Sequence, residues 1–174
     1  MRLIKNLILI CLLLFSLITT QCYADSVESL GTFLTVSLPI SSFVITYTKK
    51  DYQGAKELTL SGLTTAFVTY SLKSLVHKRR PNGGTHSFPS AHTALAFCSA
   101  EFLQKRYGWK YGLPAFLMAG FVGYSRVYAK KHYVEDVIAG ATIGFLSSFF
   151  WVKRFKTTIM IEKKGLVFLI QKSF

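Results

Sequence analysis

Acidic residues are scarce in this chain of 174 residues, which carries 8 Asp and Glu against 21 Lys and Arg. The formal charge of +13 would indicate a nucleic-acid partner in a soluble protein. The basic residues, however, form short clusters between long uncharged stretches, as they do at the ends of membrane-spanning helices. All charged residues together make up only 17% of the chain. We therefore expect a bilayer as partner and no nucleic acid.

Cysteine is also scarce. Cys11 and Cys22 lie in the apolar N-terminus, which leaves only Cys98 if that segment is removed, and one cysteine excludes an internal disulfide framework. Cys98 follows three apolar residues, which is typical of a small buried side chain. No C-x-x-C or similar spacing occurs, so the sequence predicts no metal site and no cofactor.

The N-terminus has the pattern of an export signal. Arg2 and Lys5 precede an uncharged stretch of 19 residues that ends in Ala24, directly before Asp25. This pattern favours a signal peptide over residues 1–24. The alternative is an uncleaved first transmembrane helix, because 19 residues can cross the hydrocarbon core. Either interpretation places Asp25 on the outer side.

Five apolar windows follow, and each predicts a membrane helix: 29–48, 58–72, 89–102, 111–125 and 137–152. Three of them contain only 15 or 16 residues, fewer than the roughly 20 that a span needs. Their helices should therefore extend into flanking residues, with terminal Lys or Arg reaching outward to water. The predicted fold is an all-α, polytopic transmembrane helical bundle with five body spans. Residues 1–24 add a signal peptide or a sixth span.

Basic clusters orient this bundle. Those at 49–50, 105–110 and 153–156 follow the first, third and fifth body spans, which places them in the cytoplasm by the positive-inside rule. The loops at 76–88 and 127–133 then face outward, although they are also basic. Residues 157–162 and 166–171 flank Lys163-Lys164-Gly165 and predict a small β-hairpin in the tail 157–174.

The two outward loops contain the side chains that phosphate chemistry requires. Arg80 and Arg126 carry planar forks that can bind two phosphate oxygens each, and Lys73 adds a point charge. Ser90 begins the third body helix, where free backbone N–H groups and the helix dipole favour an anion. Pro89 suits a first-turn position of that helix.

Two histidines can divide the catalytic work. His132 and Asp136 are spaced i, i+4 at the start of the last span, so the carboxylate can hold one ring nitrogen while the other attacks phosphorus. His92, one turn inside its helix, is the natural proton donor to the departing oxygen.

Three stretches of the chain resemble the motifs of the type 2 phosphatidic acid phosphatase and vanadium haloperoxidase superfamily: Lys73-x6-Arg80-Pro81, Pro89-Ser90-Ala91-His92 and Ser125-Arg126-x5-His132-x3-Asp136. The resemblance implies a metal-independent phosphatase with a phosphohistidine on His132, oriented by Asp136, and with His92 as general acid. The implied phosphate ligands are Lys73, Arg80, Ser90 and Arg126. Residues 25–156 would form the phosphatase domain.

The chain departs from the family pattern at a few positions. Ala91 stands where the family usually has Gly, which affects the expected rate more than the reaction type. Val134 and Glu135 replace the usual continuation of the third motif, and Glu135 is expected to face solvent. Outside the motifs, we expect a solvated rim that attracts anionic headgroups, formed by Lys78, Arg79, Lys130 and Lys131. Glu101 and Lys105 fit an i, i+4 pair.

The predicted function is hydrolysis of a lipid phosphomonoester or diphosphate at the outer, periplasmic face of a bacterial inner membrane. Undecaprenyl diphosphate, phosphatidylglycerol phosphate and lipid A phosphates are candidates that the loops do not distinguish. Three alternatives remain open at this point. They are a vanadate-dependent haloperoxidase, an acid phosphatase for soluble substrates, and a lipid-phosphate binding protein without catalysis.

Overall fold

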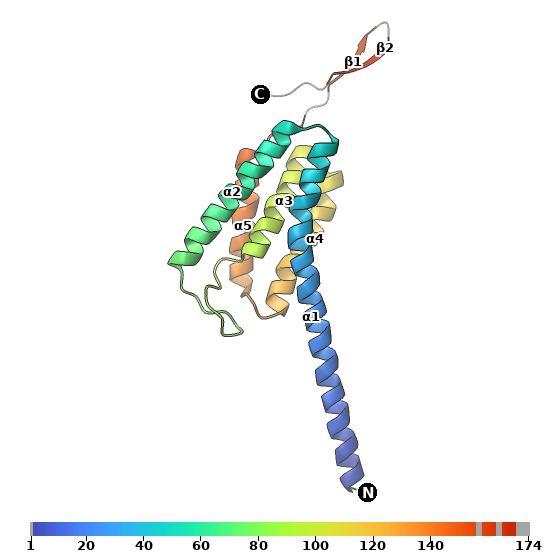
Figure 1. The fold of residues 1–174 in the computed structure, drawn as a ribbon, viewed down its shortest axis with the longest axis vertical. Helices are drawn as coiled ribbons and strands as arrows, with labels where there is room; N and C mark the ends of the chain where they lie inside the picture. The colour runs from blue at the N-terminus through green and yellow to red at the C-terminus, as the bar shows by residue number, and fades with distance from the viewer. Residues whose placement is uncertain (1, 156–157, 163–164, 170–174) are drawn as a thin grey trace.

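The body of the protein is an up-and-down arrangement of helices (Figure 1). The computed structural model describes residues 2–155, 158–162 and 165–169, and the side chains of residues 25–155. The helices in these ranges are α1 (Arg2–Thr48), α2 (Tyr52–Leu75), α3 (Ala91–Tyr107), α4 (Trp109–Tyr128) and α5 (Val134–Trp151). In α2, α4 and α5, which have 24, 20 and 18 residues, the helix extends beyond the apolar window of the sequence. The predicted extension is thereby confirmed.

The helix starts have local causes. Asp51 caps α2, because its carboxylate accepts a hydrogen bond from the Gly54 N–H at 2.9 Å. Gly108 separates α3 from α4 with a φ of 86°, a left-handed conformation that glycine adopts without strain. In α5 the Asp136 carboxylate accepts from the backbone N–H of Tyr133, the N-cap residue, at 3.0 Å.

Helix α1 has no break at the boundary predicted after Ala24. It runs through 47 residues, or about 70 Å at the usual rise, whereas a hydrocarbon core is about 30 Å thick. Its first half projects beyond the rest of the bundle (Figure 1). Two segments of the described residues are long and apolar enough to span a membrane, namely Asp25–Thr48 and Val134–Trp151.

Large apolar side chains cover much of the outer surface of the bundle. The side chains of Phe33, Phe67, Leu117 and Phe150 are 65%, 76%, 69% and 76% exposed. A bundle in water would bury such residues, whereas lipid solvates them. Many of the side chains buried between the helices are instead small or carry a hydroxyl group, for example those of Ser42, Thr65 and Ala94. This composition is typical of helix contacts in membranes. The surface and the interior both support a membrane location.

The closest packing joins α3 and α5. A Cβ added at Gly140 would lie 2.4 Å from the Ser90 carbonyl oxygen, and one at Gly144 would lie 1.9 Å from the Ala94 carbonyl oxygen. The four-residue spacing of these glycines places both on one face of α5, so the two backbones touch there.

We expect Gly144→Ala to destabilise the protein by about 1–3 kcal/mol, because the added methyl group forces α5 away from α3. Gly120→Ala is the matched control, since nothing lies within 4 Å of a Cβ at Gly120. It should be neutral or stabilising by up to about 1 kcal/mol, because alanine favours helix. The thermal unfolding midpoint in detergent measures both variants. Equal midpoints would contradict the proposed contact.

A buried ion-pair network closes the end of the bundle opposite the loops 76–90 and 129–133. The Arg106 guanidinium binds both Asp51 oxygens, at 2.7 and 2.6 Å, and Glu57 at 3.1 Å. It also donates to the Lys153 carbonyl at 2.9 Å, so it connects α2, α3 and the chain after α5. Arg106, which belongs to the basic cluster 105–110, is therefore buried and paired with carboxylates.

The predicted Glu101–Lys105 pair interacts electrostatically but forms no salt bridge. Within the described residues, the ion pairs do not include these two side chains, because Lys105 donates to the Phe149 carbonyl and lies 3.9 Å above the Phe149 ring centroid. After α5 the chain forms strands β1 (Thr158–Glu162) and β2 (Gly165–Leu169), which pair antiparallel. They lie beyond the end of the bundle opposite the loops 76–90 and 129–133 (Figure 1). The predicted strand residues 157, 170 and 171 lie outside the described residues.

Candidate active site

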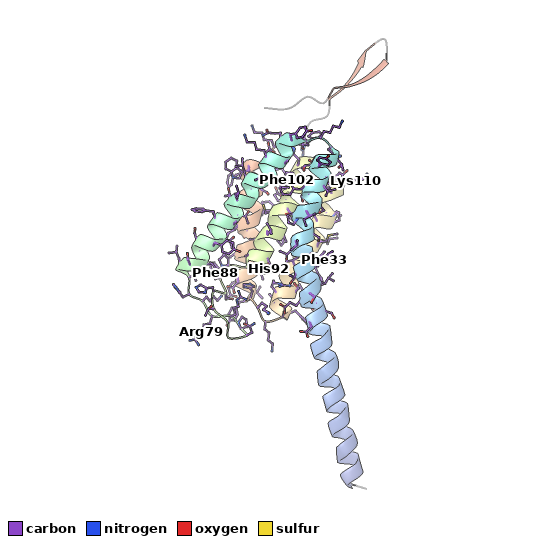
Figure 2. The ribbon with its side chains drawn as sticks, in the orientation of Figure 1. Phe33, Arg79, Phe88, His92, Phe102 and Lys110 are labelled. Carbon is purple, nitrogen blue, oxygen red and sulfur yellow. The ribbon has the colours of Figure 1, made fainter. Side chains whose placement is uncertain are left out.

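Two loops meet at one end of the bundle and carry the residues predicted for phosphate chemistry. Figure 2 shows Arg79, Phe88 and His92 at this end, opposite Phe102 and Lys110. Backbone hydrogen bonds join the first loop to the second loop and to α5. The Asn82 N–H donates to the Lys130 carbonyl at 3.1 Å, and the Ser90 N–H donates to the Asp136 carbonyl at 2.9 Å.

Lys73 and Arg80 shape the first loop. Lys73, in the last turn of α2, donates from Nζ to the carbonyls of His86 and Pro89, both at 2.9 Å. Arg80 donates from Nε to the Thr85 carbonyl at 3.1 Å. Both cations thus order the loop that leads to α3.

Ser90 is the N-cap of α3, as the sequence predicts for the start of this helix. Its side chain does not cap the helix, and its hydroxyl lies 3.0 Å from that of Thr93. The first N–H groups of α3, beginning with Ala91, therefore remain open to an anion. The first-turn position predicted for Pro89 is wrong. Pro89 precedes the N-cap, because its carbonyl accepts from Lys73 and the N–H of Ser90 donates to the Asp136 carbonyl.

Arg126 is buried, with 3% exposure, in the last turn of α4. Its guanidinium binds α1 through the Glu28 carbonyl at 2.6 Å and the Thr32 hydroxyl at 3.2 Å. It nevertheless acts electrostatically on His92 together with Lys73 and Arg80. The contribution of α1 was missed from the sequence, because nothing in the spacing of residues 25–32 relates them to the three motifs.

His132 lies in the turn between α4 and α5, not on the last helix as predicted, because Tyr133 is the N-cap of α5. Its backbone N–H donates to the Arg126 carbonyl at 3.2 Å, and its side chain is only 3% exposed. Nδ1 lies 3.8 Å from Asp136 Oδ2, and within the described side chains it makes no hydrogen bond. The carboxylate is adjacent to the ring but does not hold it.

Asp136 is fully buried and binds other donors. Its Oδ2 accepts from the Ser87 hydroxyl and the Tyr133 N–H, and its Oδ1 accepts from Lys78 Nζ at 2.7 Å. The placement of Lys78 in a solvated rim is therefore wrong. Glu135 is exposed as expected and also contacts Lys78, at 2.7 Å.

The other predicted rim residues differ among themselves. Arg79 and Lys130 are exposed, whereas Lys131 forms an ion pair with Glu28 at 3.2 Å. Within the described residues, no cluster of three or more His, Cys, Asp and Glu side chains could hold a metal ion.

The environment of His132 keeps its imidazole neutral. Burial is the largest cause, and the charges of Lys73 and Arg80 add to it, so that the pKa of His132 falls from 6.5 to about 4. The Ser87 backbone and the Asp136 carboxylate oppose this shift only in part. At neutral pH the unprotonated ring therefore keeps the free lone pair that a nucleophile requires.

Comparison with known proteins identifies the family. The family model described as PAP2 superfamily matches residues 9–160. The chain belongs to this superfamily. This confirms the family predicted from the three motifs, and all seven predicted site residues lie within the matched range.

The PAP2 chain is 31% identical over 131 residues to the lipid A 4'-phosphatase of Helicobacter pylori, a match that covers 68% of this chain and 66% of that protein. The chain thus spans just under two thirds of this relative. The crystal structure of Aquifex aeolicus LpxE superposes with a TM-score of 0.62 at 26% identity, over 76% of this chain and 84% of that one.

The crystal structure of a transmembrane PAP2 type phosphatidylglycerolphosphate phosphatase from Bacillus subtilis gives a TM-score of 0.58 at 28% identity. It covers 74% of this chain and 72% of that one. These likenesses support the helical fold and the membrane location.

Proposed function

We propose that this PAP2 protein is a membrane phosphatase that hydrolyses a phosphomonoester or diphosphate of a lipid through a phosphohistidine on His132. The observation that carries the proposal is the convergence of His132 and His92 with Lys73, Arg80 and Arg126 at one end of a bundle with an apolar surface. The cations would neutralise the phosphoryl group, and the open N-terminus of α3 adds donors for its oxygens.

The proposed reaction gives each histidine one role. Nε2 of His132 attacks phosphorus, because Nδ1 is the nitrogen next to Asp136. As the bond between phosphorus and the leaving oxygen breaks, His92 donates a proton to that oxygen. Water then attacks the phosphohistidine, His92 accepts a proton from it, and inorganic phosphate leaves. Asp136 stabilises the positive charge that develops on the His132 ring.

An apolar groove supports a lipid as the substrate. It has a volume of about 230 Å³ and lies between Pro39 and Phe43 of α1, Leu63 of α2, and Leu95 and Cys98 of α3, among other residues. The last two residues follow His92 by one to two helical turns, or roughly 5 to 9 Å along the axis. A hydrocarbon chain in this groove would extend into the bilayer while its phosphate reaches the histidines.

The basic clusters at the opposite end of the bundle support a cytoplasmic position for that end and a periplasmic position for the site. The length of α1 supports cleavage after Ala24, because residues 2–24 extend past the site end and would leave the bilayer. Mass spectrometry of protein purified from membranes should find Asp25 at the N-terminus. A retained Arg2 would contradict cleavage.

Phosphate release from a panel of lipids in detergent tests the function. We expect turnover in the presence of a chelator with undecaprenyl diphosphate, phosphatidylglycerol phosphate or lipid A, and faster turnover of at least one of them than of a soluble phosphomonoester. Preference for the soluble ester would contradict a lipid substrate. Halide oxidation with vanadate and no phosphate release would identify a haloperoxidase instead.

The pKa of His132 predicts the pH range in which the nucleophile is available. Because burial and the two cations lower this pKa to about 4, the ring should stay neutral as pH falls through 6 and become protonated near 4. Titration of the His132 imidazole by nitrogen NMR in micelles measures it without substrate. A midpoint near 6.5 would contradict the structure. Lys73→Met should move the midpoint upward, because it removes a positive charge that opposes protonation.

A further inference from the structure

Lys78 connects the first loop of the active site to α5 through the buried carboxylate of Asp136. The two residues are 58 positions apart in the chain, and Nζ lies 2.7 Å from Oδ1. The Lys78 side chain is 28% exposed, whereas that of Asp136 is 0% exposed. The ammonium also lies 4.5 Å above the Tyr133 ring centroid, next to His132 in the chain. Lys78 therefore contacts the N-cap and the first turn of α5, directly after the proposed nucleophile.

The hydrogen bonds of Asp136 leave little freedom to the carboxylate. Lys78 binds Oδ1, while Ser87 and the Tyr133 N–H bind Oδ2, the oxygen nearest to His132. The Ser87 N–H in turn donates to the Lys78 carbonyl at 2.8 Å, so the two donors are tied to each other. Donors on both sides fix the plane of the carboxylate, and with it the distance of 3.8 Å to Nδ1.

We propose that Lys78 is a positioning residue of the phosphatase reaction, which holds the Asp136 carboxylate in place beside the His132 ring and compensates part of its charge. This inference rests on the proposed function. Lys78 acts through Asp136 and touches neither the reacting phosphorus nor the leaving group.

Charge makes Lys78 suited to this role. Burial disfavours its charged form, but hydrogen bonds to Asp136 and Glu135 outweigh burial and raise the pKa of Lys78, so it stays protonated. A fully buried carboxylate without a cation would be costly. It would also act on His132 with its whole charge. The other charged groups that act on His132 are Lys73 from α2 and Arg80 from the first loop.

Lys78→Met removes the charge and keeps the length of the side chain. We expect kcat for a short-chain phosphatidic acid in detergent to fall about 10- to 100-fold, the loss typical of a misplaced catalytic group, with little change in KM. Lys78→Arg should recover most of this loss because it keeps the charge. Arg79→Met is the matched control. It removes a neighbouring exposed cation of the same loop and should leave kcat unchanged.

A double-mutant cycle separates positioning from a general structural effect. If Lys78 acts through Asp136, then Lys78→Met should cost little further kcat in protein that already carries Asp136→Asn. Additive losses would overturn the proposal. So would a loss in Lys78→Met no larger than that in Arg79→Met.

NMR titration of His132 tests the same inference without turnover, so failure of the proposed function is distinguishable from failure of this proposal. The midpoint should move upward in Lys78→Met and return towards the wild-type value in Lys78→Arg, because the uncompensated carboxylate favours imidazolium. An unchanged midpoint in Lys78→Met would overturn the proposal. If Lys78→Met does not fold, as judged by size-exclusion chromatography, Lys78→Gln provides the same comparison.

Discussion

Replacing His132 with Ala should lower kcat for lipid phosphate hydrolysis by about four to six orders of magnitude, the loss expected for a covalent nucleophile. In the structure His132 is a buried imidazole with a pKa of about 4, next to a carboxylate and near two cations. Alanine has no group that can form the phosphoenzyme. The backbone should keep its place, because the hydrogen bond to Arg126 uses the main-chain N–H.

The phosphoenzyme gives this prediction a second readout. Wild-type protein quenched during turnover of a radiolabelled lipid phosphate should carry an acid-labile, base-stable label, and His132→Ala should carry none. Lys130→Ala is the control, because Lys130 is exposed in the same loop. It should change mainly KM and its salt dependence, since exposed charges are screened. Comparable losses of kcat in both variants would contradict a nucleophile at His132.

The helices and the family could be predicted from the sequence, because both depend on local patterns. Uncharged windows located the helices, and the flanking basic residues explained why windows of 15 residues belong to longer helices. The three motifs placed the site at one end of the bundle because helices alternate in direction. Helix limits depended on cap geometry instead, which is why Pro89 and His132 were assigned to helices that begin two residues later.

Contacts between distant parts of the chain could not be predicted. The i, i+4 spacing of His132 and Asp136 correctly indicated proximity, but it does not reveal that Ser87 and Lys78 bind the carboxylate from 49 and 58 residues away. In the sequence, Lys78 and Arg79 are two adjacent basic residues of one loop. Only the structure shows that Lys78 binds Asp136 whereas Arg79 is exposed. The contact at Gly144 could not be predicted either, because it is the backbone of α3, distant in the sequence, that leaves no room for a side chain there.

Replacing His92 with Ala should lower kcat about 10²- to 10⁴-fold for a lipid phosphate, the range for a lost general acid. His92 lies in the first turn of α3, among the open N–H groups that would bind phosphate, and the charges of Lys73, Arg80 and Arg126 act on it. Without its proton the lipid alkoxide must leave as an anion. The activation barrier of this step then rises with the basicity of the leaving oxygen.

The leaving group therefore distinguishes the general acid from a phosphate ligand. A nitrophenyl phosphate needs no proton to depart, so His92→Ala should slow phosphoenzyme formation, measured by kcat/KM and by the burst of product, much less with this ester than with the lipid. The labelled phosphoenzyme should then accumulate, because the same ring would accept the proton of water in the second step. His132→Ala is the control, since its activity should fall equally with both substrates. Equal losses for both esters in His92→Ala would assign this histidine to phosphate binding rather than proton transfer.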